Sequence, residues 1–147
     1  MNFKKIILYK EPAISEINIE KLTKFLEYNF PFEVKIKENI FSEFSLKNIK
    51  ELSNTRITDI KNSFSKYDSN DTEIKFEEEL CKNSSLMDST TKVENAQEIS
   101  QVFMYDGFEL QKILRYLNED NEALHVILTN RLTCTFDEND KRYHARA

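Results

Sequence analysis

Hydrophobic residues near the start of the chain change their spacing twice. The run 6–9 is apolar at every position, which is typical of a strand covered on both faces. Apolar residues then recur at helical spacing over 19–26, between the N-cap candidate Asn18 and the helix-ending Pro31. Residues 32–37 alternate between apolar and charged, as in a strand with one solvated face. The order β-α-β and a right-handed crossover predict two parallel, neighbouring strands.

The middle of the chain is predicted to hold packing helices and then a polar insert. A helical stripe runs over 46–52, and apolar residues over 57–64 indicate another helix. Between 66 and 100 the residues Asp, Asn, Ser and Thr dominate, and only 74–76 indicates a brief strand. We therefore expect one domain over 1–147, interrupted by an acidic, partly disordered insert at about 66–100.

A strand and a helix are predicted where order returns. The apolar run 102–105 indicates the strand, and Asp106 followed by Glu109 has the acidic form of a capping box. Apolar residues over 110–117 then fall at positions i, i+3, i+4 and i+7, which is the clearest helical stripe in the chain. A helix that begins at Asp106 is therefore expected.

The last elements are predicted to be a strand and a hairpin. The short apolar run 124–129 indicates a central strand. Residues 133–136 and 142–144 then flank a polar four-residue turn, as in a hairpin. Together the elements predict the α/β class: a three-layer-like small mixed sheet with a β-α-β start, packing helices, and a C-terminal strand plus hairpin.

Composition excludes several classes of function. Gly107 is the only glycine, so neither a Walker loop nor a dinucleotide fingerprint can be written. Cys81 and Cys134 do not form a secreted disulfide framework, and no segment has the length of a signal core or a membrane span. The net charge is −5, and no basic cluster is available for phosphate binding. We expect a cytoplasmic protein that binds neither nucleic acid nor a membrane.

Most residues whose side chains could bind a metal or take part in catalysis lie in 124–147, yet their spacing matches no known motif. The potential zinc donors are Cys81, His125, Cys134 and His144. Structural zinc sites usually take ligands in close pairs, which are absent here. A hairpin could still bring His125, Cys134 and His144 together; the alternatives are a small buried Cys134 and a hydrogen-bonded strand histidine at His125. An EF-hand reading of 137–142 fails because Arg142 replaces the turn glycine, so a solvated turn is favoured.

Two catalytic arrangements can be written for the same segment. A Cys134 nucleophile with a His144 base would need a cation such as Arg131 or Arg142 to lower the thiol pKa. Alternatively, the two turn aspartates could act as an acid and base pair. The catalytic candidates are Arg131, Asp137, Asp140, Arg142 and His144.

A small basic and aromatic patch is also present near the C-terminus. Its members are Arg131, Phe136, Lys141, Arg142, Tyr143 and Arg146. These side chains could meet an anionic partner. The alternative is that their charges pair internally with the acidic residues of the predicted turn.

Two stretches of the chain resemble a known family. They are Tyr-Asp-Gly-Phe-Glu-Leu-Gln-Lys at 105–112 and Thr-Asn-Arg-Leu-Thr-Cys-Thr-Phe-Asp-Glu-Asn-Asp-Lys-Arg-Tyr-His-Ala-Arg at 129–146. Both resemble an uncharacterised archaeal family, found mainly in methanogens and labelled metallopeptidases, while the N-terminal match is looser. The resemblance implies that this chain corresponds to the N-terminal part of the family pattern. His-Glu-x-x-His occurs nowhere in the chain, so the label does not carry over to named ligands.

Three functional hypotheses therefore stay open at this point. The first is an uncharacterised archaeal protein with a metallopeptidase-related fold that lacks a recognisable metal motif and is not catalytic as it stands. The second is an interaction or regulatory module that uses the basic C-terminal hairpin to bind a protein partner, or to self-associate through 131–147. The third is a small metal-binding protein, with zinc as the candidate ion.

Overall fold

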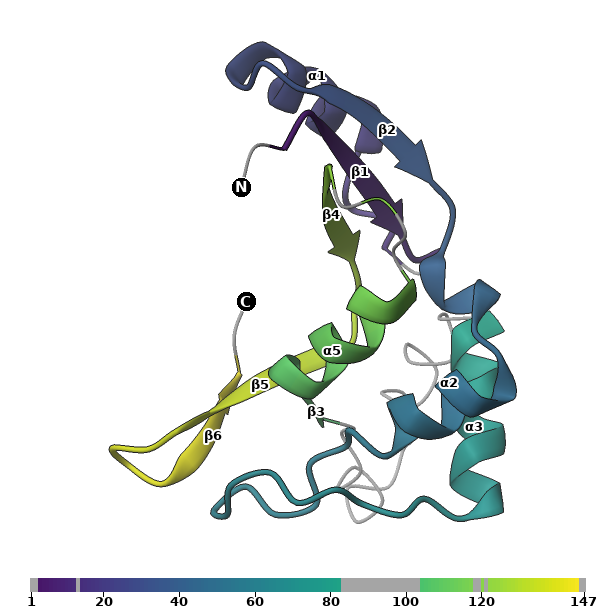
Figure 1. The fold of residues 1–147 in the computed structure, drawn as a ribbon, viewed down its shortest axis with the longest axis vertical. Coiled ribbons are helices and arrows are strands. Elements are labelled where there is room, and N and C mark those ends of the chain that lie inside the picture. Colours follow the sequence, from purple (N-terminus) through teal and green to yellow (C-terminus); the bar gives the residue numbers. More distant parts are fainter. Residues whose placement is uncertain (1–2, 13, 83–103, 118–119, 121, 146–147) are drawn as a thin grey trace.

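The computed structural model describes residues 3–12, 14–82, 104–117, 120 and 122–145, and Figure 1 shows their arrangement. The described elements form a mixed α/β fold that starts with a strand and then a helix, as the fold-class prediction states. Its strands lie in two three-stranded sheets, one at the top and one at the lower left of the figure. None of the described helices is long and apolar enough to cross a membrane.

The upper sheet is parallel and has the order β2-β1-β4. It contains β1 (Lys5–Lys10), β2 (Glu33–Lys37) and β4 (Ala123–Leu128). Helix α1 (Ile19–Asn29) connects β1 to β2 and begins as predicted, with the Asn18 side chain accepting from the Lys21 N–H at 2.9 Å. The predicted central position of the strand at 124–129 is wrong, because β1 lies between β4 and β2. Periodicity identifies a strand but does not give its place in a sheet.

The lower sheet has the order β3-β5-β6 and contains the predicted hairpin. Strand β3 (Met104–Asp106) pairs in parallel with β5 (Leu132–Asp137), and β5 pairs in antiparallel with β6 (Arg142–Ala145). Lys141 closes the turn in the left-handed region, at φ 55°. Helix α5 (Gly107–Leu117) follows β3 directly, while positions 102 and 103 of the predicted strand lie outside the described residues.

A third group of elements contributes, together with α5, to the core that Ile7 and Tyr9 of β1 enter. It consists of the 3-10 helix η1 (Ile40–Glu43), α2 (Leu46–Ser53) and α3 (Asp71–Lys82). The helix predicted over 57–64 is wrong, because this segment forms turns in which the Asp59 side chain accepts from the Lys61 N–H at 2.8 Å.

The strand predicted at 74–76 is also wrong, because these residues belong to α3. Glu77, Leu80 and Cys81 of this helix are buried, so part of the expected insert packs into the fold. Its remainder, 83–100, lies outside the described residues.

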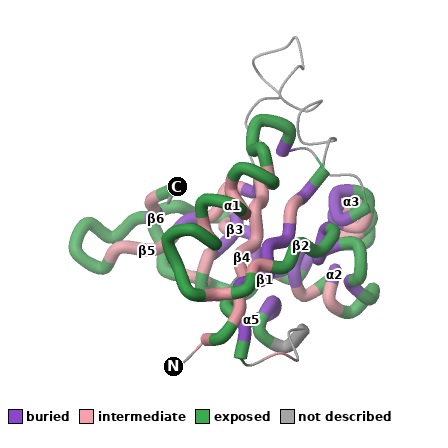
Figure 2. The backbone as a smooth tube through the Cα atoms, turned by 90° about the horizontal axis from the view of Figure 1, so that it is seen from above, coloured by how far each residue is buried: buried purple, intermediate pink, exposed green. Residues whose placement is uncertain are grey.

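The hydrophobic core lies where β1 meets the helices. Ile7 and Tyr9 point from β1 toward this core, and Phe41, Leu52 and Tyr105 are its least exposed large members. Figure 2 shows that α1, β2 and the β5–β6 hairpin are mostly intermediate or exposed. Ile6 and Leu8, which alternate with Ile7 and Tyr9, are also buried, so the central strand β1 is covered on both faces while β2 and β4 are more exposed.

Candidate functional site

A buried network of charged side chains lies between the two sheets. Glu11 follows β1, Arg131 lies between β4 and β5, Glu77 comes from α3, Tyr105 comes from β3, and Arg56 follows α2. The side chains of Arg131 and Glu77 are 0% exposed, that of Glu11 is 1% exposed and that of Arg56 is 5% exposed. Buried charges are stable only when they are paired and hydrogen-bonded, so the contacts of this network decide what it can do.

Arg131 is the centre of the network. Its Nε donates to Glu11 Oε1 at 3.3 Å, and its Nη1 donates to Glu77 Oε1 and to the Tyr105 hydroxyl at 3.0 Å. The guanidinium also lies over the Phe41 ring, 4.4 Å from its centroid. This planar group therefore joins the end of the upper sheet to α3 and to the lower sheet.

Glu77 is the second junction. Its Oε2 accepts from Arg56 Nη2 at 2.6 Å and from the Tyr105 hydroxyl at 2.9 Å. The remaining acceptor, Glu11 Oε2, binds the Thr129 hydroxyl at 3.0 Å and the Asn130 N–H at 3.3 Å. Two arginines thus balance two glutamates, and the formal charge of the network is zero.

The pKa shifts in the network agree with a closed ion-pair system. Burial raises the pKa of Glu11, against the attraction of Arg131. Burial disfavours the Arg131 cation, yet the negative groups around it hold its pKa above the usual value. Burial also raises the pKa of the Cys81 thiol to about 12, so this thiol stays protonated and unreactive. We interpret the network as a device that fixes the two sheets to each other.

Asp106 and Tyr143 attach the hairpin to α5. Asp106 Oδ1 accepts from the N–H groups of Phe108 and Glu109, both at 3.0 Å, which confirms the predicted cap. Its Oδ2 accepts from the Tyr143 hydroxyl at 2.7 Å, and the Tyr143 N–H donates to the Ile60 carbonyl at 2.8 Å. Burial and the bond to Asp106 raise the pKa of Tyr143.

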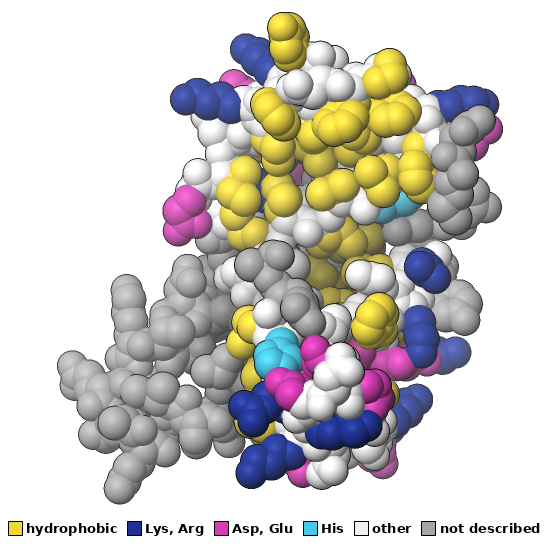
Figure 3. Space-filling view, turned by 90° about the vertical axis from the view of Figure 1, so that its left-hand side faces the viewer, with side chains coloured by type: hydrophobic (Ala, Val, Ile, Leu, Met, Phe, Trp, Pro, Cys, Tyr) yellow, Lys and Arg dark blue, Asp and Glu magenta, His cyan; other side chains and the backbone are white. Residues whose placement is uncertain are grey.

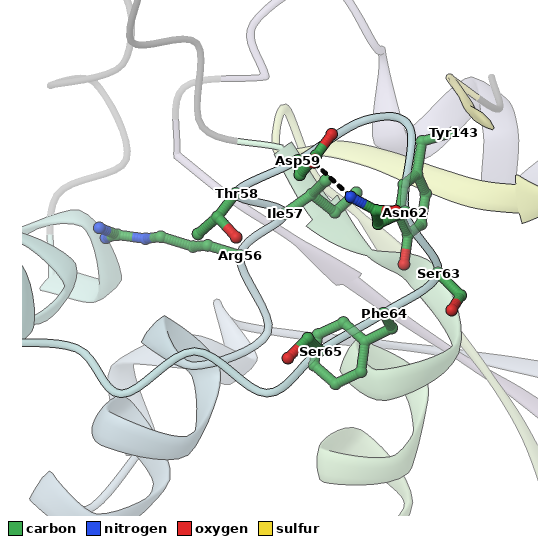
Figure 4. A pocket seen from close by; sticks show the side chains of 9 residues that line it. All are labelled: Arg56, Ile57, Thr58, Asp59, Asn62, Ser63, Phe64, Ser65 and Tyr143. Carbon is green, nitrogen blue, oxygen red and sulfur yellow. Dashed lines mark hydrogen bonds between the residues drawn. The ribbon is translucent and has the colours of Figure 1, made fainter. Parts of the chain in front are cut away.

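A pocket of about 130 Å³ lies beside these contacts and is shown in Figure 4. The turn segment after α2 and Tyr143 line it, and Asn62 Nδ2 donates to the Asp59 carboxylate at its rim. Pockets that enclose small organic ligands are usually larger, roughly 300–1,000 Å³. Its size therefore suits a few water molecules better than a substrate.

The predicted zinc set of His125, Cys134 and His144 is not brought together. Cys134 pairs with Ala145 and His144 pairs with Thr135, so Cys134 and His144 lie on opposite faces of the hairpin. This geometry also separates the proposed Cys134 nucleophile from its His144 base. Cys134 is 2% exposed, and burial followed by the charge of Asp106 raises its thiol pKa.

His125 lies on the upper sheet as a hydrogen-bonded strand histidine. Its Nδ1 lies 3.0 Å from the Tyr9 hydroxyl, and its Nε2 lies 3.1 Å from the Asp120 carbonyl. The carbonyl can only accept, so Nε2 carries the proton and Nδ1 accepts from Tyr9. Both ring nitrogens are therefore occupied within the chain.

Three of the predicted catalytic residues, His144 among them, do come together at the end of the hairpin. Asp137, Asp140 and His144 place one ligand atom each within 4.8 Å of one another. Asp137 and His144 lie on the same face of the hairpin, and the turn returns Asp140 toward them, with Oδ2 2.7 Å from His144 Nε2. Figure 3 shows a histidine side chain among acidic side chains in the lower part of the view. The register of the hairpin creates this cluster, which the search for close ligand pairs missed.

The basic patch is largely neutralised within the chain. Arg131 is buried in the network, Lys141 Nζ binds Glu138 Oε2 at 2.6 Å, and Arg142 Nε lies 3.7 Å from Asp140 Oδ2. Arg146 lies outside the described residues. These contacts favour internal pairing over an open anion-binding surface.

Comparison with known proteins gives one match. Residues 2–147 match the model of a family described as "Probable metallopeptidase family (DUF6775)". No curated protein and no solved structure matches the chain.

Proposed function

Because this chain belongs to that metallopeptidase family, we propose that it binds a divalent metal ion through Asp137, Asp140 and His144. The observation that carries the proposal is the convergence of one imidazole and two carboxylates at the hairpin end. Among the described residues, this is the one group of three or more such side chains that could hold an ion together.

The donor set fits a catalytic type of metal better than a purely structural one. Catalytic zinc usually has three protein ligands of the His and carboxylate type and keeps a further position for water, whereas structural zinc is rich in cysteine. One nitrogen and two oxygen donors also suit Mn²⁺. Asp140 Oδ2 lies 2.7 Å from His144 Nε2, and the Asn139 N–H donates to Asp137 Oδ1 at 2.8 Å. The cluster is thus partly ordered before binding.

A metal ion in such a site can polarise a carbonyl group and activate a bound water. The protein residues described here would hold the ion and orient it, with Tyr143 fixing the strand that carries His144. The small pocket is lined by Tyr143, which alternates with His144 along β6 and therefore lies on the opposite face of the hairpin from the cluster. We expect metal binding without peptide hydrolysis by this chain alone.

The proposal is tested by titrating the purified chain with Zn²⁺ and Mn²⁺ in a calorimeter, and with Co²⁺ in an absorption spectrometer. We expect one equivalent of metal to bind, and Co²⁺ to show the visible bands of a nitrogen and oxygen site. His144→Ala and Asp140→Asn each remove a ligand and should weaken binding about tenfold or more, which corresponds to about 1.4 kcal/mol.

Glu138→Gln is the matched control, because Glu138 lies in the same turn but contacts Lys141 instead of the cluster. This variant should bind metal as the unmodified chain does. Equal affinity in all four proteins, or no binding at all, would overturn the proposal. Casein digestion that is abolished by a chelator would instead contradict the expected absence of hydrolysis.

A further inference from the structure

The two edges of the upper sheet differ in their protection against other strands. Edge strand β2 has the sequence EVKIK, in which three of five residues are charged. Edge strand β4 has the sequence ALHVIL and no Asp, Glu, Lys or Arg. Edge strands without charges or prolines are templates for pairing with another chain. We propose that a second copy of this chain adds its own β4 to this edge in antiparallel orientation.

The backbone of β4 has the groups that this pairing needs. The Glu11 N–H donates to the Leu128 carbonyl at 3.1 Å, so the peptide groups of Leu128 point toward β1. Because backbone groups alternate along a strand, those of Leu124 and Val126 also point toward β1. Those of His125 and Ile127 point outward, and no described strand lies beyond them. This outer edge is separate from the side-chain contacts of His125.

The sequence of β4 is complementary to itself about Val126. In an antiparallel pair with its two-fold axis there, His125 of each copy lies opposite Ile127 of the other. These are the residues whose peptide groups point outward, so they form the hydrogen-bonded pairs. The alternate residues point their side chains to the other face of the sheet. There, Leu124 of one copy lies opposite Leu128 of the other, and the two Val126 residues lie opposite each other. Every cross-strand pair on that face is apolar, which is the arrangement that stabilises a sheet.

The surface around β4 also has the area of an interface. The large hydrophobic residues exposed on and beside α1 and β4 are Ile17, Phe25, Tyr28, Phe30 and Leu124. Figure 3 shows hydrophobic side chains gathered in the upper part of the view. At roughly 200 Å² for each full side chain, their exposed fractions amount to roughly 540 Å². This is near the upper limit for monomers and approaches the roughly 800 Å² that each partner buries in a stable complex.

The proposed edge differs from the one that the sequence suggested. Self-association through 131–147 was expected because the hairpin ends a sheet, and β6 is indeed an edge strand. However, Arg142 and Lys141 lie on or beside β6, and such charges oppose strand addition. The uncharged β4 is therefore the better site for a second copy.

The oligomeric state gives the first test. Light scattering on the full chain at high micromolar concentration should give twice the chain mass of 17.5 kDa. Leu124→Lys places a charge opposite Leu128 of the second copy and should weaken the dimer about tenfold or more. Ile36→Lys is the matched control, because it makes the same kind of change at a half-exposed position of the opposite edge strand. It should leave the dimer intact.

Crosslinking tests the register independently. Val126→Cys would place two thiols at the two-fold axis, at a separation that a disulfide can span, so oxidation should give a covalent dimer. The native Cys81 and Cys134 are buried and should not interfere, and Ile36→Cys should stay monomeric on a denaturing gel. Circular dichroism establishes that each variant is folded.

A full chain that stays monomeric overturns the proposal. So does a dimer that survives Leu124→Lys and gives no crosslink through Val126→Cys, because such a dimer associates elsewhere, for example through 131–147. Loss of the dimer in both lysine variants would place the interface on a surface that includes β2 and not at the β4 edge. Metal binding at the hairpin plays no part in any of these outcomes.

Discussion

The replacement Arg131→Met tests whether the buried network fixes the two sheets to each other. Methionine is unbranched and flexible, so it can fill most of the space of the arginine side chain while removing its charge. The change leaves Glu11 Oε1 and Glu77 Oε1 without the cation that joins them. It also removes the contact with the Phe41 ring. Little else in the packing needs to move.

The expected loss of stability is large because the remaining charges stay buried. Removing one partner of a buried ion pair typically costs about 3–5 kcal/mol, and here Glu11 loses its cation while Glu77 keeps only Arg56, with both carboxylates almost fully inaccessible. A typical domain has an unfolding free energy of about 5–15 kcal/mol, so the variant would lose a substantial fraction of it. At this chain length the melting temperature should fall by roughly 6–20 °C.

The loss of stability caused by Arg131→Met should depend on pH because of Glu11. Burial already raises the pKa of Glu11 above 4.5 in the folded chain, and Arg131 is the main attraction that opposes this rise. Without Arg131 the pKa of the folded state rises further, so the folded state binds the proton more tightly than the unfolded state does. The unfolding free energy of the variant then falls as the pH rises from the pKa of Glu11 in the unfolded chain to its higher pKa in the folded chain. The deficit should shrink when the pH is lowered from about 8 toward 5.

Urea unfolding followed by circular dichroism measures both effects, once the transition is shown to be two-state. Arg142→Met is the matched control, since it makes the same chemical change on an exposed part of the hairpin and should leave the melting temperature unchanged. Glu11→Gln added to Arg131→Met should restore part of the loss, because it removes one stranded charge. A deficit below about 1 kcal/mol, or one that is the same at every pH, would refute the electrostatic account.

Two further predictions concern the hairpin anchor and the thiols. Asp106→Ala removes the α5 cap, at about 0.5–2 kcal/mol, and also leaves the Tyr143 hydroxyl without its acceptor, so we expect at least the upper part of that range. Asp106→Asn keeps an acceptor and should lose clearly less; equal melting temperatures for the two variants would contradict the role of the cap. Cys81 and Cys134 should not react with a thiol reagent in the native chain, because both are buried and their thiol pKa values are raised. Rapid labelling without denaturant would show that their surroundings open.

Sequence patterns identified elements whose signals are local. The apolar stripe that begins at Leu110 and the Asp106 cap predicted α5, and the turn at 137–140 predicted the hairpin that the structure contains. Helix α3 escaped detection because its sequence DTEIKFEEELCK resembles a solvated, acidic segment. Glu77 is buried only because Arg56 and Arg131, 21 and 54 residues away, supply its partners. Such long-range pairing leaves no periodic signal in the chain.

In the candidate site, too, the individual residues could be predicted from the sequence but their spatial grouping could not. All three members of the hairpin cluster were singled out from the sequence, but their grouping was not, because it follows from the register that places Asp137 and His144 on one face. Cys134 was joined to His144 because a hairpin was expected to bring them together, and the alternation of side chains along β6 separates them. The place of β4 at the edge of its sheet likewise depends on strand order, which hydrophobic periodicity does not encode.

The pairing of β1 with β4 has a consequence for how the chain folds during synthesis. The two strands are parallel neighbours that lie far apart in the sequence. Lys5 can pair only after Ala123 has been synthesised, and Glu11 can bind only after Arg131, 120 residues later, has been synthesised. A ribosome must therefore synthesise the chain through β4 before the upper sheet can close. Until then the apolar segment at 6–9 has β2 as its one strand neighbour in this sheet, which makes it a target for chaperones. Contacts of such long range also predict slow, highly cooperative folding in which neither sheet becomes stable alone.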